Sequence, residues 1–292
     1  MPPGRYFTHI PMLLLPICLL FSCAAGKTMT VGATAALLED VARSAYRQSD
    51  LRLIREGMPA YLMLIDGMAA AVPDNERLLI SAAQAYASFG SAFILEEDPD
   101  YARVLYGRAK DYALRALQQV GFENPAGAEF DTFEKKLDTL PKSQVPALFW
   151  AASCWANWIA SNQRSMEAMA ELPRVELMMK RVLELDERFY YGGAHVFMGI
   201  LEASRPKIAG GDLNKAKDHF LKAIELAKGK FLMSRVYYAA YYARKTFDKQ
   251  LFVATLQQVL DTPADIEPDL TLLNTVAHMR ARKMLSEVDE YF

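Results

Sequence analysis

The spacing of apolar residues constrains this chain more than any other feature. From about residue 34 to the end, apolar side chains recur at i, i+3 or i+4, and i+7, which is the period of an amphipathic helix. No run of β-branched residues alternates with polar ones over the length of a strand. Turn-forming clusters, such as Pro73-Asp74-Asn75, interrupt the pattern about every 15 to 25 residues. The sequence therefore predicts an all-α fold.

Residues 213–227 carry the clearest local helix signals. Asp212 is a suitable N-cap, and Gly229 can take the left-handed conformation that ends a helix. Asp218 and Lys222 are four residues apart, so they can form an ion pair on one helix face. The segment 210–212 could also bind an anion at the helix N-terminus with Lys207 nearby, but a turn followed by an N-cap is the simpler interpretation.

The small and bulky residues also fall into four successive helix pairs. A tetratricopeptide unit has small residues where two antiparallel helices cross, and stacked units form a concave face. The matching positions are Leu79, Ala82, Ala83 and Tyr86 with Ala109, Ala113 and Ala116; Leu148, Ala151, Ala152 and Trp155 with Val175, Met179 and Val182; Gly199 with Ala216, Phe220 and Ala223; and Val236, Ala239 and Ala240 with Phe252, Leu256 and Val259. The pattern predicts a helical-hairpin array of divergent tetratricopeptide-like repeats, forming a single domain over residues 34–292. An unrelated helical bundle is the alternative, since any bundle uses alanine at crossings.

The N-terminus has the features of a lipoprotein signal peptide. Arg5 precedes an apolar run over residues 10–21, which is shorter than the roughly 20 residues that cross a bilayer. Ser22 then precedes Cys23, and lipoprotein signal peptidase prefers a small residue directly before the acylated cysteine. We expect a signal peptide over residues 1–22, a lipid anchor on Cys23 and a flexible tether over residues 23–33. An ordinary signal peptide cut near residues 24–26 is the alternative, and either places the mature chain outside the cytoplasm.

Composition and motifs argue against several classes of function. The net charge of −2 gives no basic surface for nucleic acid. Once Cys23 is acylated, Cys154 is the only thiol of the mature chain, so no intrachain disulfide can form. The histidines lack metal-ligand spacing, and Gly26-Lys27-Thr28 lacks the earlier glycine of a phosphate-binding loop. We therefore expect no enzyme activity, no metal and no cofactor.

Aromatic residues are concentrated in three places. Trp150, Trp155 and Trp158 fall within nine residues of one predicted helix, and four tyrosines of residues 237–242 occupy two adjacent rows of another. Tyr190 and Tyr191 precede a pair of glycines. Aromatic residues at helical spacing usually form core, but buried tyrosine hydroxyls need hydrogen-bond partners. A groove, a tunnel or a subunit interface satisfies that need better than a dry core.

The segment 190–243 points to a family. It contains Tyr191-Gly192-Gly193-Ala194-His195, Arg205-Pro206-Lys207, Gly210-Gly211-Asp212, and Lys230-Phe231 followed by Tyr237-Tyr238. These elements resemble the T-component lipoproteins of TRAP transporters, which are tripartite ATP-independent periplasmic uptake systems. Weaker matches at residues 73–75, 112–117, 263–265 and 281–292 extend the resemblance over about residues 33–292.

The resemblance implies a non-enzymatic accessory subunit. Such proteins are all-helical homotrimers that contact the substrate-binding P-component, and each subunit is thought to hold a pore or cavity for an apolar ligand. We expect the ligand or partner surface near Tyr190, Tyr191, His195, Lys207, Phe231, Tyr237, Tyr238, Tyr241 and Tyr242. The alternative is an envelope-assembly or cell-wall scaffold lipoprotein. A hydrolase on a helical scaffold would need a clustered acid, base or metal site.

Overall fold

The computed structural model describes residues 40–292, and every regular element in that range is helical. The predicted signal peptide, Cys23 and the tether lie outside the described residues. After a helical segment over residues 40–46, the helices are α2 (Leu51–Ala71), α3 (Glu76–Phe89), α4 (Pro99–Gln119), α5 (Phe130–Asp138), α6 (Val145–Ser161), α7 (Met166–Ala170), α8 (Leu172–Asp186), α9 (Phe189–Ser204), α10 (Leu213–Leu226), α11 (Met233–Tyr237), α12 (Lys249–Asp261), α13 (Thr271–Ser286) and α14 (Val288–Tyr291). π-Helical turns η1 (Gly90–Ile94) and η4 (Tyr238–Ala243) extend α3 and α11, and short 3₁₀ turns occupy η2 (Lys142–Gln144), η3 (Lys207–Ala209) and η5 (Pro268–Leu270). None of the helices described is long and apolar enough to cross a membrane.

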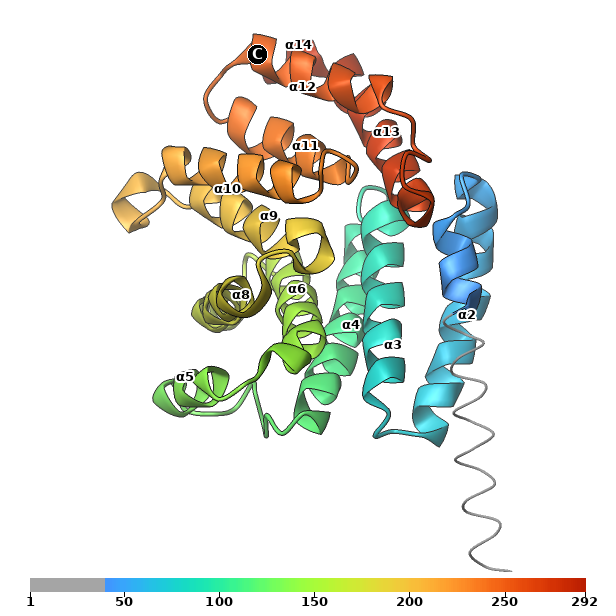
Figure 1. Ribbon diagram of the computed structural model, residues 1–292, viewed down its shortest axis with the longest axis vertical. Helices are drawn as coiled ribbons and strands as arrows, with labels where there is room; N and C mark the ends of the chain where they lie inside the picture. Colours follow the sequence, from blue (N-terminus) through green and yellow to red (C-terminus); the bar gives the residue numbers. More distant parts are fainter. Residues whose placement is uncertain (1–39) are drawn as a thin grey trace, which may run out of the picture.

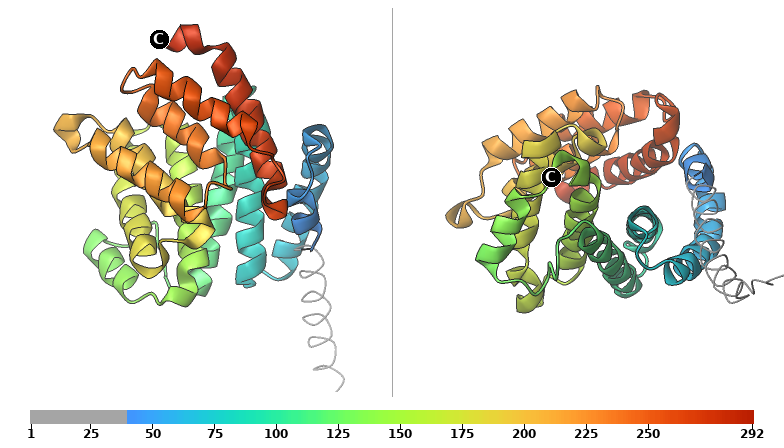
Figure 2. Two further views of the ribbon diagram at one scale, coloured as in Figure 1. Left: turned by 45° about the horizontal axis from the view of Figure 1, so that its top comes forward. Right: turned by 60° about the horizontal axis from the view of Figure 1, so that its bottom comes forward.

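The helices follow one another around a curved path (Figures 1 and 2). Consecutive helices pack side by side from α2 through α3, α4, α6 and α8, and α9 packs along α10. The path closes because α13 returns to the N-terminal part of the chain. Lys283 of α13 pairs with Glu96 just after η1, and Arg47 pairs with Asp269 at 2.7 Å. Residues far apart in sequence therefore surround one interior space.

Small residues set the close approach of neighbouring helices. Ala82 and Ala83 of α3 and Ala109 and Ala113 of α4 are fully buried where these two helices pack. The helix pairs α3 with α4, α6 with α8, α9 with α10, and η4 with α12 correspond to the four predicted hairpins. The all-α fold is confirmed, whereas the assignment of these pairs to tetratricopeptide repeats stays a prediction.

Side-chain caps fix where many helices begin. The carboxylate of Asp212 accepts hydrogen bonds from the backbone N–H groups of Asn214 and Lys215, as its predicted N-cap role requires. Asp50, Asn75, Asp98, Ser165 and Asp248 cap their helices in the same way. Each such cap contributes about 1 kcal/mol. Gly229 has a φ of +69°, as expected for a residue that ends a helix, but Lys222 pairs with Glu225 at 3.5 Å rather than with Asp218.

A partly buried carboxylate network attaches α2 to the next two helices. Asp66 of α2 accepts hydrogen bonds from the hydroxyls of Tyr86 on α3 and Tyr112 on α4, each at 2.7 Å. Arg108 adds an ion pair to the same carboxylate at 3.1 Å. If this contact opened, the Asp66 carboxylate and the two tyrosine hydroxyls would each lose a hydrogen-bond partner. The network therefore holds α2 in place beside α3.

One buried asparagine organises the C-terminal part of the fold. The side chain of Asn274 on α13 is fully buried and accepts a hydrogen bond from the backbone N–H of Leu232 at 3.0 Å. Its amide donates to the carbonyls of Lys230 and Ala264, also at 3.0 Å. The three bonds join α13 to the loop before α11 and to the loop after α12, and so fix the position of Phe231.

We expect Asn274→Ala to lower the free energy of unfolding by about 3 kcal/mol, because it leaves the buried N–H of Leu232 and two partly buried carbonyls without their partners. Asn274→Asp is the matched variant. It keeps an acceptor for Leu232 but loses both donors, so it should also destabilise. Urea unfolding followed by circular dichroism measures both. A free energy of unfolding for Asn274→Ala within about 0.5 kcal/mol of the parent's would contradict this role of Asn274.

Candidate ligand-binding cavity

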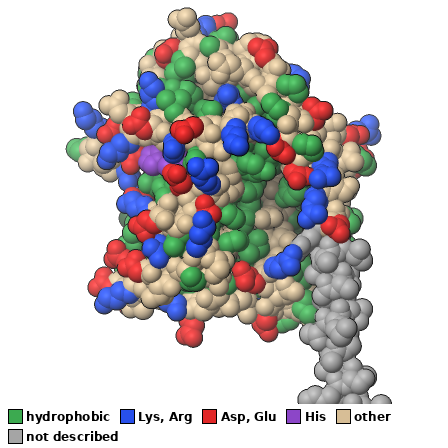
Figure 3. Space-filling view, in the orientation of Figure 1, with side chains coloured by type: hydrophobic (Ala, Val, Ile, Leu, Met, Phe, Trp, Pro, Cys, Tyr) green, Lys and Arg blue, Asp and Glu red, His purple; other side chains and the backbone are tan. Residues whose placement is uncertain are grey.

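The helical path encloses a cavity of about 1010 Å³. Its lining comes from residues 41–46, α2, α3, η1, α6, α9, the segment 231–237 and α13. Figure 3 shows apolar side chains gathered in a recessed area of one face, near the edge formed by α2. The cavity therefore lies where the C-terminal helices return to the N-terminal ones.

Aromatic rings form one wall of the cavity. Tyr190 lies at the centre, with its ring centroid 4.8 Å from that of Trp150 and 5.4 Å from that of Phe149. The ring of Phe231 lies 6.0 Å from Tyr190 on the other side. The rings meet mostly edge to face, which is a favourable aromatic arrangement. This wall offers a large apolar surface to a ligand.

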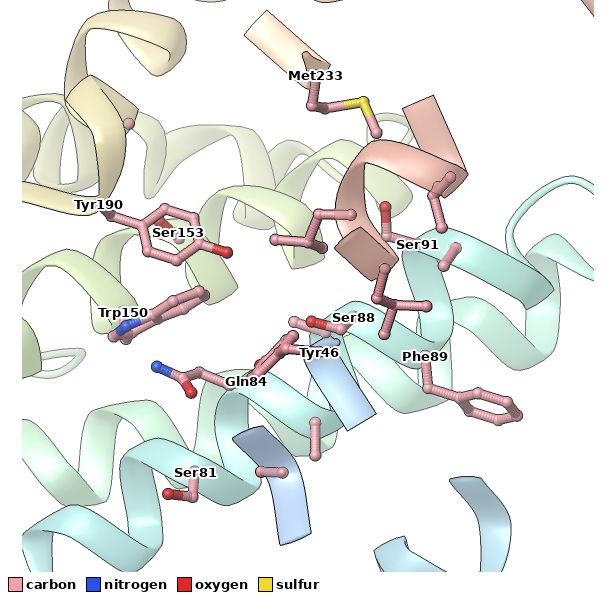
Figure 4. A pocket seen from close by; sticks show the side chains of 18 of the residues that line it. Tyr46, Ser81, Gln84, Ser88, Phe89, Ser91, Trp150, Ser153, Tyr190 and Met233 are labelled. Carbon is pink, nitrogen blue, oxygen red and sulfur yellow. The ribbon is translucent and has the colours of Figure 1, made fainter. Parts of the chain in front are cut away.

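An unusual backbone conformation places Tyr190 in this wall. Tyr190 and Tyr191 have φ values of +46° and +58°, and Gly192 follows at +75°. A left-handed conformation costs a non-glycine residue about 1 to 3 kcal/mol and persists where the surroundings enforce it. Here the enforcement includes close packing: a Cβ at Gly193 would lie 2.6 Å from the ring of Phe149. The glycine pair that follows Tyr190 and Tyr191 thus allows a backbone bend that turns the Tyr190 hydroxyl into the cavity (Figure 4).

Burial keeps the hydroxyls of Tyr46 and Tyr190 protonated at physiological pH. Burial raises the pKa of Tyr190 well above its usual value, and the neighbouring hydroxyls of Tyr46, Tyr191 and Tyr237 raise it further. Burial also raises the pKa of Tyr46 to about 12. Tyr46, Tyr190 and Tyr237 make no hydrogen bond to another residue within the described part of the chain. Their hydroxyls are available to a bound molecule.

A polar stripe forms the opposite side of the cavity. Ser81, Gln84, Ser88 and Ser91 follow one another at helical spacing along α3 and η1, so they share one face. Figure 4 shows this row across the cavity from Tyr190 and Trp150. The cavity therefore has an aromatic side and a polar side.

The structure divides the sequence-predicted site residues into two groups. Tyr190, Phe231 and Tyr237 line the cavity, and Tyr191 packs against Phe231 with ring centroids 5.6 Å apart. Tyr241 is half exposed and contacts Tyr237 with ring centroids 6.1 Å apart.

The remaining predicted residues lie away from the cavity. Tyr238 stacks on Tyr242 at 5.1 Å and packs in a cluster with Phe220, outside the cavity lining. Lys207 is exposed in the turn η3. His195 packs between α9 and α10, where its Nδ1 lies 2.9 Å from Nδ1 of His219.

Sequence reasoning did not propose the polar side of the cavity. The spacing of Ser81, Gln84 and Ser88 on one helix face was a usable signal, because a polar row inside an otherwise apolar helix pattern indicates wet surroundings. Arg280, which also lines the cavity, lies 189 residues from its partner Ser91 and had no local signal. The structure describes no group of three or more histidine, cysteine or acidic residues that could hold a metal ion.

The sequence matches the family model of the TRAP transporter T-component over residues 47–292. The chain belongs to this family. No curated protein matches the sequence. The family is that of a transporter accessory subunit.

We expect Tyr238→Ala to lower the free energy of unfolding by about 3 to 5 kcal/mol and to leave unchanged the amount of any small molecule that co-purifies with the protein. The reason is that Tyr238 is 5% exposed and packs in the α9–α10 cluster, so its loss leaves a void there. Thermal unfolding and the mass of co-purified ligand measure the two effects. Tyr242→Ala is the companion variant, and loss of ligand at unchanged stability would contradict this placement.

Proposed function

We propose that this T-component is a lipid-anchored subunit that holds the substrate-binding P-component near the membrane and passes an apolar ligand through its cavity. The observation that carries the proposal is the aromatic-walled cavity in a member of a transporter family. Transport is favoured over the envelope-scaffold alternative because the chain belongs to a transporter family and its cavity has room for a ligand.

The size and lining of the cavity support an apolar ligand. Its volume of about 1010 Å³ lies at the upper end of the roughly 300 to 1,000 Å³ of ligand sites. Val196, Phe197 and Ile200 of α9 continue the wall formed by Tyr190 and Trp150. An extended hydrocarbon chain can bury its surface against such a wall, at about 25 cal/mol per Å² removed from water.

The anchor supports a role at the membrane surface. Acyl chains on Cys23 would each contribute about 0.8 kcal/mol for every methylene buried in the bilayer, and more than one chain holds firmly. The domain described from residue 40 would then stay close to the membrane and to the other transporter subunits. We place the protein in the periplasm on this basis, with residues 23–33 as tether.

The quaternary and repeat assignments also belong to the proposal. Membership of the family supports a homotrimer and a contact with the P-component. The four packed helix pairs support divergent tetratricopeptide-like repeats. A rigid array of this kind presents the same surface to each partner.

We expect Ser153→Phe to reduce co-purified apolar ligand about tenfold, because Ser153 lines the cavity beside Tyr190 and a phenyl ring there would take up part of the space for the ligand. Native mass spectrometry of the purified protein reports the ligand and the number of subunits together. Ser286→Phe at the exposed end of α13 is the control and should keep the ligand. Equal ligand in both variants, or none in the parent protein, would refute the ligand role.

We expect Cys23→Ser to move the protein from the membrane fraction to the soluble fraction, because it removes the thiol that would be acylated. Cys18→Ser, which changes the other cysteine of the N-terminal region, should leave the protein in the membrane fraction. Immunoblotting of fractionated cells measures both. Retention of Cys23→Ser at the membrane would exclude the anchor.

A further inference from the structure

Arg280 of α13 lines the cavity, and its guanidinium is only partly hydrogen-bonded. The side chain is partly buried and lines the cavity. Its Nη2 donates to the backbone carbonyl of Ser91 at 2.7 Å and to the Ser91 hydroxyl at 3.1 Å. Its Nη1 meets only the sulfur of Met233, at 3.7 Å. A guanidinium has five N–H donors, so Nε–H and one N–H of Nη1 have no hydrogen-bond partner among the described residues.

The other charged residues of the cavity lining leave Arg280 without a carboxylate. Arg43 pairs with Asp40 at 3.4 Å, and Asp269 pairs with Arg47 at 2.7 Å. Burial raises the pKa of Glu76, at the start of α3. Within residues 40–292, no acidic side chain forms an ion pair with Arg280.

Two tyrosine hydroxyls lie within the electrostatic influence of the same guanidinium. Burial raises the pKa of Tyr106 to about 12, and the charge of Arg280 opposes that rise. Burial likewise raises the pKa of Tyr241, again against the effect of Arg280. These neutral hydroxyls can solvate the cation but cannot neutralise it. A partly buried positive charge with neutral neighbours favours an anion from outside the chain.

Arg280 and the aromatic wall lie on different sides of one cavity. Figure 4 shows Ser91 and Met233, the two residues that Arg280 contacts, across from Trp150 and Tyr190. The polar stripe on α3 ends at Ser91. A ligand that satisfies both sides must be charged at one end and apolar along its length.

We propose that the cavity binds a single-chain amphiphile with a carboxylate head, with the carboxylate on Arg280 and the hydrocarbon chain against the aromatic wall. A carboxylate matches the planar edge of a guanidinium with two parallel hydrogen bonds. This inference rests on the proposed function, since it names the class of ligand for the same cavity.

The test compares two probes that differ only in the head group, sodium dodecanoate and 1-dodecanol. Isothermal titration calorimetry with the full chain should give dodecanoate an affinity at least about tenfold above that of dodecanol, as expected for a charge-assisted pair. Arg280→Gln should lower the dodecanoate affinity to the dodecanol level and leave dodecanol binding unchanged. Arg280→Lys keeps the charge but not the planar fork, so it should fall between the two.

The controls separate the possible failures. Arg282→Gln removes an exposed arginine two residues along α13 and should bind both probes as the parent does. If the parent binds both probes equally, or if Arg280→Gln weakens both equally, the head-group assignment is wrong while the apolar cavity stands. If neither probe binds the parent, the proposed ligand role fails with it. Should Arg280→Gln fail to fold by circular dichroism, the parent's preference and the Arg280→Lys variant decide the question.

Discussion

Close packing through small side chains is the constraint on which the rest of the structure depends. Alanines at the α3–α4 and α4–α6 contacts, among them Ala109 and Ala113, are fully buried, so neighbouring backbones approach closely over most of their length. Bulky side chains are then displaced to the edges of each contact. Trp155 and Phe133 fill the main core, while Trp150 and Phe149 face the interior space. The packing that stabilises each pair thus also supplies the cavity wall.

The closure of the helical path depends on contacts of another kind. Polar and charged side chains of α13 reach across to segments near the start of the domain and to the loops around α11. Asn274 bonds three backbone groups, and Arg280 bonds Ser91 in η1. π-Helical turns are often found at functional sites, and both η1 and η4 adjoin residues of the cavity lining. The cavity exists because this return brings two distant parts of the chain face to face.

Local features of the sequence were sufficient to predict the helices and several of their ends. The N-cap at Asp212 and the left-handed Gly229 are determined by neighbours within four residues, so they could be inferred without a structure. Tyr190, in one of the aromatic-rich segments, lines the cavity, whereas its part in a ligand or partner surface stays a prediction. Arg280 could not be found in that way, because its environment is created by helices that are far apart in sequence.

The tyrosine rows show why a periodic pattern does not decide which face is functional. Tyr237 and Tyr238 are adjacent, yet one lines the cavity and the other is packed against Phe220. Successive residues on a helix point about 100° apart, so only the packing of neighbouring helices decides the direction of each ring. The π-helical turn that begins at Tyr238 changes the spacing further. Periodicity could therefore identify the segment but not the individual side chains.

The contact between His195 and His219 fixes the arrangement of protons between α9 and α10. Nε2 of His195 lies 3.3 Å from the Glu187 carboxylate, which can only accept, so Nε2 of His195 carries the hydrogen. Nδ1 of His195 then carries a lone pair, which accepts a hydrogen bond from Nδ1–H of His219 at 2.9 Å. Burial lowers the pKa of both rings. The charge of Lys222 lowers the pKa of His195 further and Glu187 opposes this, whereas Lys215 lowers the pKa of His219 further and Asp218 opposes this. A directed chain of neutral imidazoles thus ends on one carboxylate, and it can exist only while neither ring takes up a second proton.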